Sequence, residues 1–152
     1  MANYQIKNWN DLNVVLQKVV AEAMEETVAQ DVKKMESENV EEFVYSAYDP
    51  TIYERRMNNG GLSDIKNMSH VVNVNGNSVE LTVENNTMSN NEFLPINEYP
   101  HKIANEVEFG YGYNYMNMEE RAFQREIINE LKYGKAKTLL LKGLKKKGIK
   151  AK

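Results

Sequence analysis

Residues 71–83 read VVNVNGNSVELTV, two runs in which apolar and polar residues alternate on either side of Asn75-Gly76. A period of two is typical of a β-strand with one buried face. Asn-Gly is a preferred pair for a two-residue hairpin turn, because both positions take a positive φ. The stretch therefore predicts an antiparallel hairpin, with an apolar face made by Val72, Val74, Val79, Leu81 and Val83.

A long helical pattern precedes this hairpin and begins near Asp11, a suitable N-cap residue. Apolar residues recur there at spacings of mostly three, four or five, which marks one face of a helix. No Gly or Pro interrupts residues 11–48, so one helix of about 36 residues and about 54 Å is possible, with a kink or break expected at Ser37-Glu38-Asn39. The apolar positions are Leu12, Val15, Leu16, Val19, Ala23, Val28, Val32, Met35, Val40, Phe43 and Val44.

The segments next to the hairpin read as connectors. Asp49-Pro50 ends the helical pattern, because the residue before Pro disfavours helical backbone. Pro50 is then expected to open a short helix through Arg56, which Asn58-Asn59-Gly60-Gly61 ends. Residues 85–102 are rich in Asn and contain two Pro, so they predict a long surface loop.

The last third of the chain is predicted to be mainly helical. Residues 103–109 form a third strand or a short helix, and a further helix starts near Glu119 and breaks at Gly134. The fold class is therefore α+β: a long N-terminal amphipathic helix packed on a small antiparallel sheet, with C-terminal helices. We expect a single domain over residues 1–133 and a basic amphipathic segment over residues 134–152.

Composition argues against most kinds of catalysis. The chain of 152 residues contains no Cys, which excludes thiol chemistry and thiolate metal sites, and its two His, His70 and His101, lack metal-ligand spacing. No apolar run approaches the roughly 18 residues that a membrane-spanning helix needs. We therefore expect a protein that is not an enzyme, with no catalytic, cofactor-binding or metal site and no membrane contact.

Charge is unevenly distributed along the chain. Residues 132–152 carry nine Lys and no acidic residue, so this segment contributes +9 to a net charge of −3 and the remainder contributes −12. Such a segment suggests an interaction tail. The Lys residues could neutralise DNA phosphates or form the solvated face of a terminal helix. The candidates are Lys142, Lys145, Lys146 and Lys147.

Two further groups of residues are candidates for an interface. Arg55 and Arg56 are adjacent, and they could clamp an acidic partner or anchor the connector internally. Tyr111, Tyr113 and Tyr115 alternate with Gly and Asn, and Tyr is enriched at interface cores. These tyrosines could equally pack on a helix of their own chain.

The predicted elements favour assembly into an oligomer. A hairpin is marginal alone and leaves two strand edges with unpaired backbone groups. A helix of about 54 Å exceeds the dimensions of a compact domain of this size, whose radius of gyration is about 15 Å. Contact with neighbouring copies accounts for both features.

The order of these motifs resembles the small tail-completion, or neck, proteins of tailed bacteriophages. The similarity rests on the long acidic helix, Gly60-Gly61-Leu62, the Asn-Gly hairpin, Val107-Glu108-Phe109-Gly110 and Arg121-Ala122-Phe123. It covers most of residues 11–133. The family has an Arg/Lys-Pro-Phe-like sequence at the start of its final helix, whereas position 122 of this chain is Ala. The Asn and Lys bias, with 15 Lys against 4 Arg, agrees with a phage of a low-GC Gram-positive host.

This resemblance implies a structural protein of the virion, assembled in the cytoplasm of the host bacterium. It implies a ring of six or twelve copies at the head–tail interface, in contact with other neck, connector or tail proteins and with packaged DNA as a further contact. The alternative is a nucleic-acid-binding phage accessory protein that uses the Lys-rich C-terminus.

Overall fold

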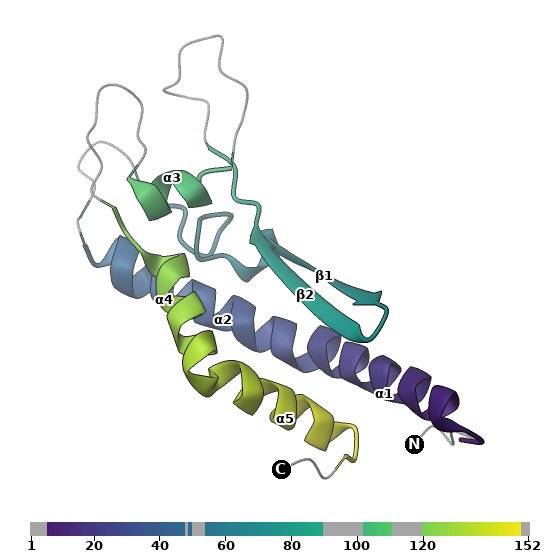
Figure 1. Cartoon of the computed structure of the whole chain (residues 1–152). Coiled ribbons are helices and arrows are strands. Elements are labelled where there is room, and N and C mark those ends of the chain that lie inside the picture. The colour runs from purple at the N-terminus through teal and green to yellow at the C-terminus, as the bar shows by residue number, and fades with distance from the viewer. Residues whose placement is uncertain (1–5, 48, 50–53, 90–101, 111–119, 150–152) are drawn as a thin grey trace. The chain divides into compact units, whose positions relative to one another are not determined.

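The structure is a computed structural model that describes residues 6–47, 49, 54–89, 102–110 and 120–149 (Figure 1). It confirms the predicted α+β class: a long N-terminal helix, an antiparallel two-stranded sheet and C-terminal helices. The elements in chain order are α1 (Trp9–Ala23), α2 (Ala29–Asn39), β1 (Met68–Asn75), β2 (Ser78–Asn85), α3 (Ala104–Phe109), α4 (Phe123–Glu130) and α5 (Ala136–Lys146).

The N-terminal helix contains two π-helical turns. Helical backbone runs from Trp9 to Tyr45, and the turns Met24–Val28 and Val40–Tyr45 follow α1 and α2. The helix starts before Asp11, because the Asn8 side chain is the N-cap and accepts a hydrogen bond from Asp11 N at 2.9 Å. A break at residues 37–39 is absent, since these residues are helical, and the winding changes at the next residue, Val40.

The first π turn occurs where the apolar spacing widens to five. Ala23 and Val28 lie five residues apart across this turn, and both are buried. A π turn holds one more residue than an α turn, so it returns the fifth residue to the same face. Met35 and Val40 have the same spacing, but they precede the second π turn, which runs from Val40 to Tyr45 and therefore does not account for it.

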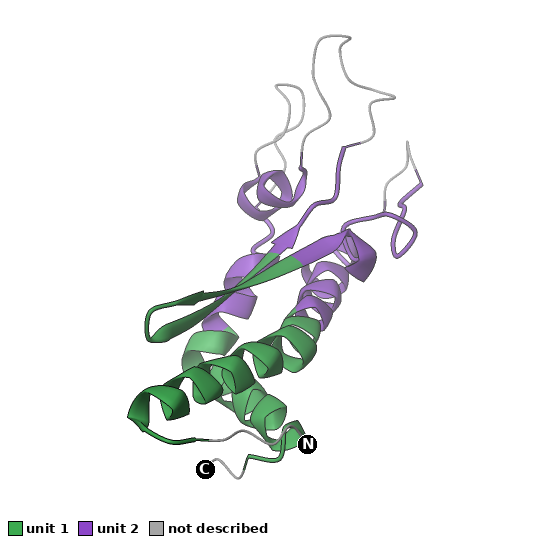
Figure 2. Ribbon diagram, turned by 90° about the vertical axis from the view of Figure 1, so that its right-hand side faces the viewer, with its two compact units in different colours: residues 1–32, 70–83, 130–152 green, residues 33–69, 84–129 purple. Residues whose placement is uncertain are grey.

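The chain forms two compact units (Figure 2). Unit 1 comprises Met1–Val32, His70–Val83 and Glu130–Lys152, and unit 2 comprises Lys33–Ser69 and Glu84–Asn129. The division at residue 134 that we expect from the sequence stays a prediction.

In unit 1, α5 packs against α1 and the first π turn. Leu139 of α5 is buried, and a Cβ on Gly143 would lie 3.0 Å from both Cβ and the carbonyl oxygen of Ala23. Glycine therefore allows a close approach of the two helices. Gly134 has a φ of 105° at the kink between α4 and α5, as its position in the sequence predicts.

The hairpin of unit 1 lies beside α1. The Asn13 side chain donates to Asn77 Oδ1 at 3.1 Å, and Gln17 Nε2 donates to the carbonyl oxygen of Gly76. The predicted apolar face is half-buried at Val72, Val79, Leu81 and Val83. It is wrong at one position, because Val74, near the turn, is 47% exposed.

Residues 103–109, expected as a third strand or a short helix, contain helix α3. The sheet within the described part of the chain therefore has two strands.

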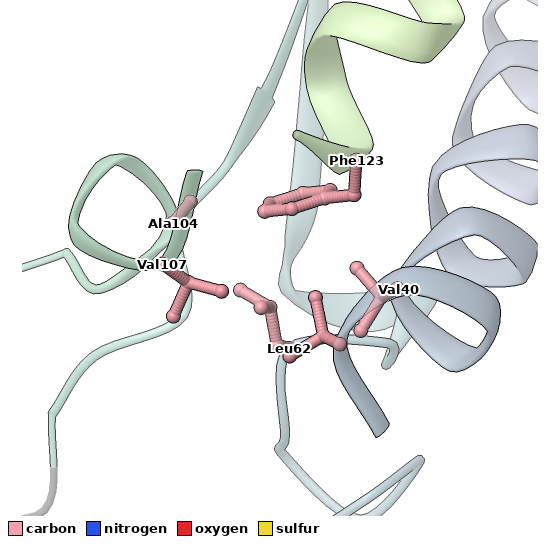
Figure 3. Packing of buried hydrophobic residues seen from close by; sticks show 6 residues of the cluster. Val40, Leu62, Ala104, Val107 and Phe123 are labelled. Atoms are coloured by element: carbon pink, nitrogen blue, oxygen red, sulfur yellow. The ribbon is translucent and has the colours of Figure 1, made fainter. Parts of the chain in front are cut away.

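The core of unit 2 gathers side chains from four separate segments (Figure 3). Phe123, the first residue of α4, is completely buried, and its ring points toward Ala104 and Val107 of α3. Val40 at the start of the second π turn is also completely buried. The cluster consists of Val40, Val44, Leu62, Ala104, Val107 and Phe123.

A buried carboxylate joins α3 to α4. Glu108 Oε2 accepts from Gln124 N at 2.8 Å, and Oε1 accepts from Arg125 N at 3.0 Å. Two backbone donors at the start of a helix, which otherwise lack partners, are thereby satisfied. The helix predicted near Glu119 begins at Phe123. The Glu108 carboxylate therefore lies at the N-terminus of this helix, where negative charge is favourable.

Glu36 is a second buried acid of unit 2. Its Oε1 accepts from Asn85 Nδ2 at 3.1 Å. Burial raises the pKa of Glu36, and the charge of Glu108 raises it further, while hydrogen bonds from Asn85 and Gln124 oppose the shift. A raised pKa favours the protonated form in the folded state. The protonated Glu36 carboxyl therefore contributes to the stability of the folded protein. This contribution is fully present below the ordinary Glu pKa of 4.5 and is lost as the pH rises through the raised pKa of Glu36.

We therefore expect Glu36→Gln to melt at a higher temperature than the parent protein at pH 7. Gln keeps an acceptor for Asn85 without a buried charge. The difference should shrink as the pH falls through the raised pKa of Glu36 toward 4.5, because the parent carboxyl takes up its proton over that range. Thermal melts at both pH values measure this, with Glu38→Gln on the exposed face of α2 as the matched control. A lower melting temperature for Glu36→Gln than for the parent protein at pH 7 would contradict a destabilising buried charge at Glu36.

Candidate functional site

A pocket of about 200 Å³ in unit 2 brings three arginines together. Arg55 and Arg56, predicted from the sequence as interface residues, are joined there by Arg121 from the segment that precedes α4. Glu106 of α3 also lines the pocket. The remaining described lining residues are Val44, Tyr45, Gly61, Leu62, Ile103 and Val107.

The connector that carries Arg55 and Arg56 is set by a tight turn. Residues 54–56 are not helical, so the short helix expected from Pro50 through Arg56 is wrong over these residues, whereas residues 50–53 lie outside the described part. A Cβ on Gly61 would lie 2.3 Å from the carbonyl oxygen of Met57, so the turn requires glycine at this position. Gly60 has a φ of 83°.

Asp64 fixes the far side of the turn. Its Oδ2 accepts from Gly60 N at 2.8 Å, and its Oδ1 accepts from Lys66 N at 3.0 Å. The hydrogen bond from Lys66 N is the larger cause of a lowered pKa at Asp64, and the hydrogen bond from Gly60 N lowers that pKa further.

Backbone carbonyl groups hold Arg55 and Arg56 in place. Arg55 Nη1 donates to the carbonyl oxygen of Tyr45 at 2.6 Å, and its Cζ lies 5.2 Å from the centre of the Tyr45 ring. Arg56 Nη2 donates to the carbonyl oxygen of Met88 at 2.7 Å. Internal anchoring, one of the two roles considered for this pair, is therefore present.

The lining of the pocket suits an acceptor that is negatively charged and partly apolar. Three arginines and one glutamate are among the described lining residues, and Val44, Leu62 and Val107 of the same lining are buried in the core of unit 2. Guanidinium groups bind carboxylates through paired hydrogen bonds. A volume of about 200 Å³ is below the range of about 300–1,000 Å³ for small-molecule sites. The pocket is thus of a size for a side chain.

The structure separates the candidate lysines into two groups. Lys142 Nζ lies 2.6 Å from Asp31 Oδ2, and Lys147 Nζ lies 2.6 Å from Glu26 Oε1 and 3.3 Å from Glu22 Oε2. Hydrogen bonds to Glu26 and Glu22 raise the pKa of Lys147. These lysines bind the acidic face of the N-terminal helix within unit 1. Lys145 and Lys146 are exposed on α5.

The other candidate residues and groups give no further site. Tyr111, Tyr113 and Tyr115 lie outside the described residues. Among the residues that the structure describes, no three His, Cys, Asp or Glu gather as a metal site would require. No helix over those same residues is long and apolar enough to cross a membrane.

Arg121 and Tyr45 were not predicted as site residues. Arg121 follows residues 111–119 and lies far along the chain from Arg55, so spacing gave no reason to combine them. The scarcity of Arg was a usable signal, because the pocket collects three of the four in the chain.

Comparison with known proteins relates nearly the whole chain to one family. Residues 8–146 match the family model described as YomN. Comparisons with curated proteins and with solved structures give no match.

Proposed function

Because the chain belongs to the YomN family, which derives from Bacillus phage, it is a phage-associated protein, and we propose that it is a structural virion protein. In this proposal it forms a ring of copies at the head–tail interface and makes contact with neighbouring neck, connector or tail proteins. It acts by binding rather than by catalysis.

The observation that supports this proposal is the hairpin, whose two strands pair with no third strand among the described residues. Each of the two eight-residue strands pairs with the other alone among the described residues, so within that part of the chain each strand has one open edge. Long open edges invite backbone pairing with another chain, and proteins commonly shorten or cover them. Like subunits that meet head to tail close into a ring when their rotation permits it. The hairpin therefore supports a role in assembly.

Ion pairs in unit 1 argue against the nucleic-acid-binding alternative. Lys142 and Lys147 would have to leave Asp31, Glu22 and Glu26 to neutralise phosphates. Charges that are already paired release fewer counterions on binding DNA, and counterion release supplies most of non-specific affinity.

The location of the protein in the virion tests the proposal. Antibodies against the purified chain, coupled to gold, should label intact phage particles at the junction of head and tail in electron micrographs. Antibodies against the major tail protein serve as the control. Label confined to the tail tip or the capsid surface, or absent from purified particles in which the tail protein is labelled, would contradict the proposed position.

A further inference from the structure

We propose that a basic groove on α5 binds an acidic turn of a second copy of this chain. This inference rests on the proposed ring, and it assigns the contact that holds neighbouring copies together. The acidic turn consists of Glu41, Glu42 and Phe43, within the second π turn. The basic groove has a volume of about 620 Å³, and its described lining residues are Thr138, Leu141, Lys142, Lys145 and Lys146.

The basic groove carries positive charge that its own chain leaves unpaired. Lys145 and Lys146 are exposed, and neither forms an ion pair with another described residue. Lys142 differs, because its Nζ lies 2.6 Å from Asp31 Oδ2 within unit 1. No acidic residue is among the described lining residues of the groove. An acid that pairs with Lys145 and Lys146 therefore has to come from elsewhere.

The acidic turn carries negative charge at an unfavourable place. Glu41 and Glu42 are exposed, and neither has an ion-pair partner in the described part of the chain. They lie in the last turn of the N-terminal helix, which ends at Tyr45 and has no basic residue in that turn. The C-terminal end of a helix carries partial negative charge, so carboxylates there are unfavourable unless a cation is near. Two lysines of a neighbouring copy would offset this interaction, which the isolated chain leaves unrelieved.

The two surfaces match in their apolar parts as well as in charge. Phe43 follows the two carboxylates and is 39% exposed, and Leu141, which lines the groove, is half-buried. Ammonium and carboxylate groups form charge-assisted hydrogen bonds, and an aromatic ring beside them adds apolar contact area. DNA phosphates would match the lysines but would leave Leu141 without an apolar partner. The groove therefore favours an acidic protein segment that carries an aromatic residue.

The two surfaces belong to different parts of one chain, which favours a contact that propagates. The basic groove lies in unit 1 and the acidic turn lies in unit 2. One copy can therefore receive the acidic turn of a neighbour in its groove while it presents its own turn to the next copy. A contact between two different surfaces of this kind generates a ring or a filament, whereas a self-complementary surface stops at a dimer.

Charge reversal of each surface, followed by mixing, tests the proposal with the full chain. The groove variant carries Lys145→Glu and Lys146→Glu, and the turn variant carries Glu41→Lys and Glu42→Lys. We expect each variant alone to self-associate roughly tenfold or more weakly than the parent protein, because each places like charges together. An equal mixture of the two variants should associate about as strongly as the parent protein, because every groove then finds a turn of opposite charge. Sedimentation velocity over a range of protein concentrations gives the association constants, and circular dichroism confirms that each variant is folded.

Lys132→Glu combined with Lys137→Glu is the matched control for the groove variant. Both lysines are exposed, have no ion-pair partner among the described residues and lie outside the groove. The control changes the net charge by the same amount and should associate like the parent protein. Should the groove variant fail to fold, Lys145→Gln combined with Lys146→Gln removes the charge without reversing it and should still weaken association.

Three outcomes would contradict the account in different ways. Parent-like association of a folded groove or turn variant, or no recovery in the mixture, would overturn the inference while leaving the ring intact. Weaker binding of the groove variant to duplex DNA, together with parent-like self-association, would overturn it as well and assign the groove to nucleic acid. A parent chain that never associates would instead refute the proposed function, and the inference with it.

Discussion

Replacing Phe123 with Ala should lower the free energy of unfolding of unit 2 by about 3–5 kcal/mol, the usual range for a large aromatic side chain in a core. Phe123 is completely buried and belongs to the cluster with Val40, Leu62 and Val107 (Figure 3). It is also the first residue of α4, so its loss affects the start of that helix. Because domains are stable by about 5–15 kcal/mol, this change removes a large share.

Urea unfolding followed by circular dichroism measures the effect. Ile128→Ala is the matched control, since Ile128 lies on the same helix and is 49% exposed. Its midpoint should stay near that of the parent protein, whereas the midpoint of Phe123→Ala should fall clearly. Equal midpoints for the two variants would show that the cluster around Phe123 does not hold unit 2 together.

The hairpin and the long helix could be predicted because their signals are local. Alternation around Asn75-Gly76 fixes the turn, and the apolar stripe from residue 12 to residue 44 requires a helix of that length. The π turns were not predicted, although the five-residue spacing from Ala23 to Val28, across the first of them, was visible in the sequence. A spacing of five indicates either a break in a helix or an extra residue within it, and the packing partner decides between them.

Features that depend on contacts between distant segments were harder to predict. Residues 104–109 carry both Val and Phe, which favour strands, yet they form α3 and place Glu108 at the start of α4. The cap joins two residues that are 16 apart, with residues 111–119 between them. Tertiary packing thus overrides the local preference for a strand.

The same reason explains the partial prediction of the site. Arg55-Arg56 stood out as a pair, and two possible roles followed from chemistry alone. The backbone N–H of Arg121 donates to the carbonyl oxygen of Val107 at 3.2 Å, and this contact holds Arg121 beside the pocket. The spacing of residues along the sequence does not reveal such a contact. The reverse holds for Lys142 and Lys147. Their run suggested a solvated or DNA-binding face, but the acidic helix of unit 1 pairs with them.

Ring formation is the claim on which the account depends. The open strand edges of the hairpin need a neighbouring chain for the role proposed for them. One chain has a mass of 17.6 kDa. A closed head-to-tail ring has a fixed copy number, so its mass should not drift with concentration once the ring has formed.

Native mass measurement of the full chain, alone and mixed with candidate head and tail proteins of the same phage, tests this most directly. We expect a single closed species of six or twelve copies, six or twelve times the 17.6 kDa of one chain, which persists on dilution. A protein that remains at 17.6 kDa at high concentration and in every mixture would contradict the ring.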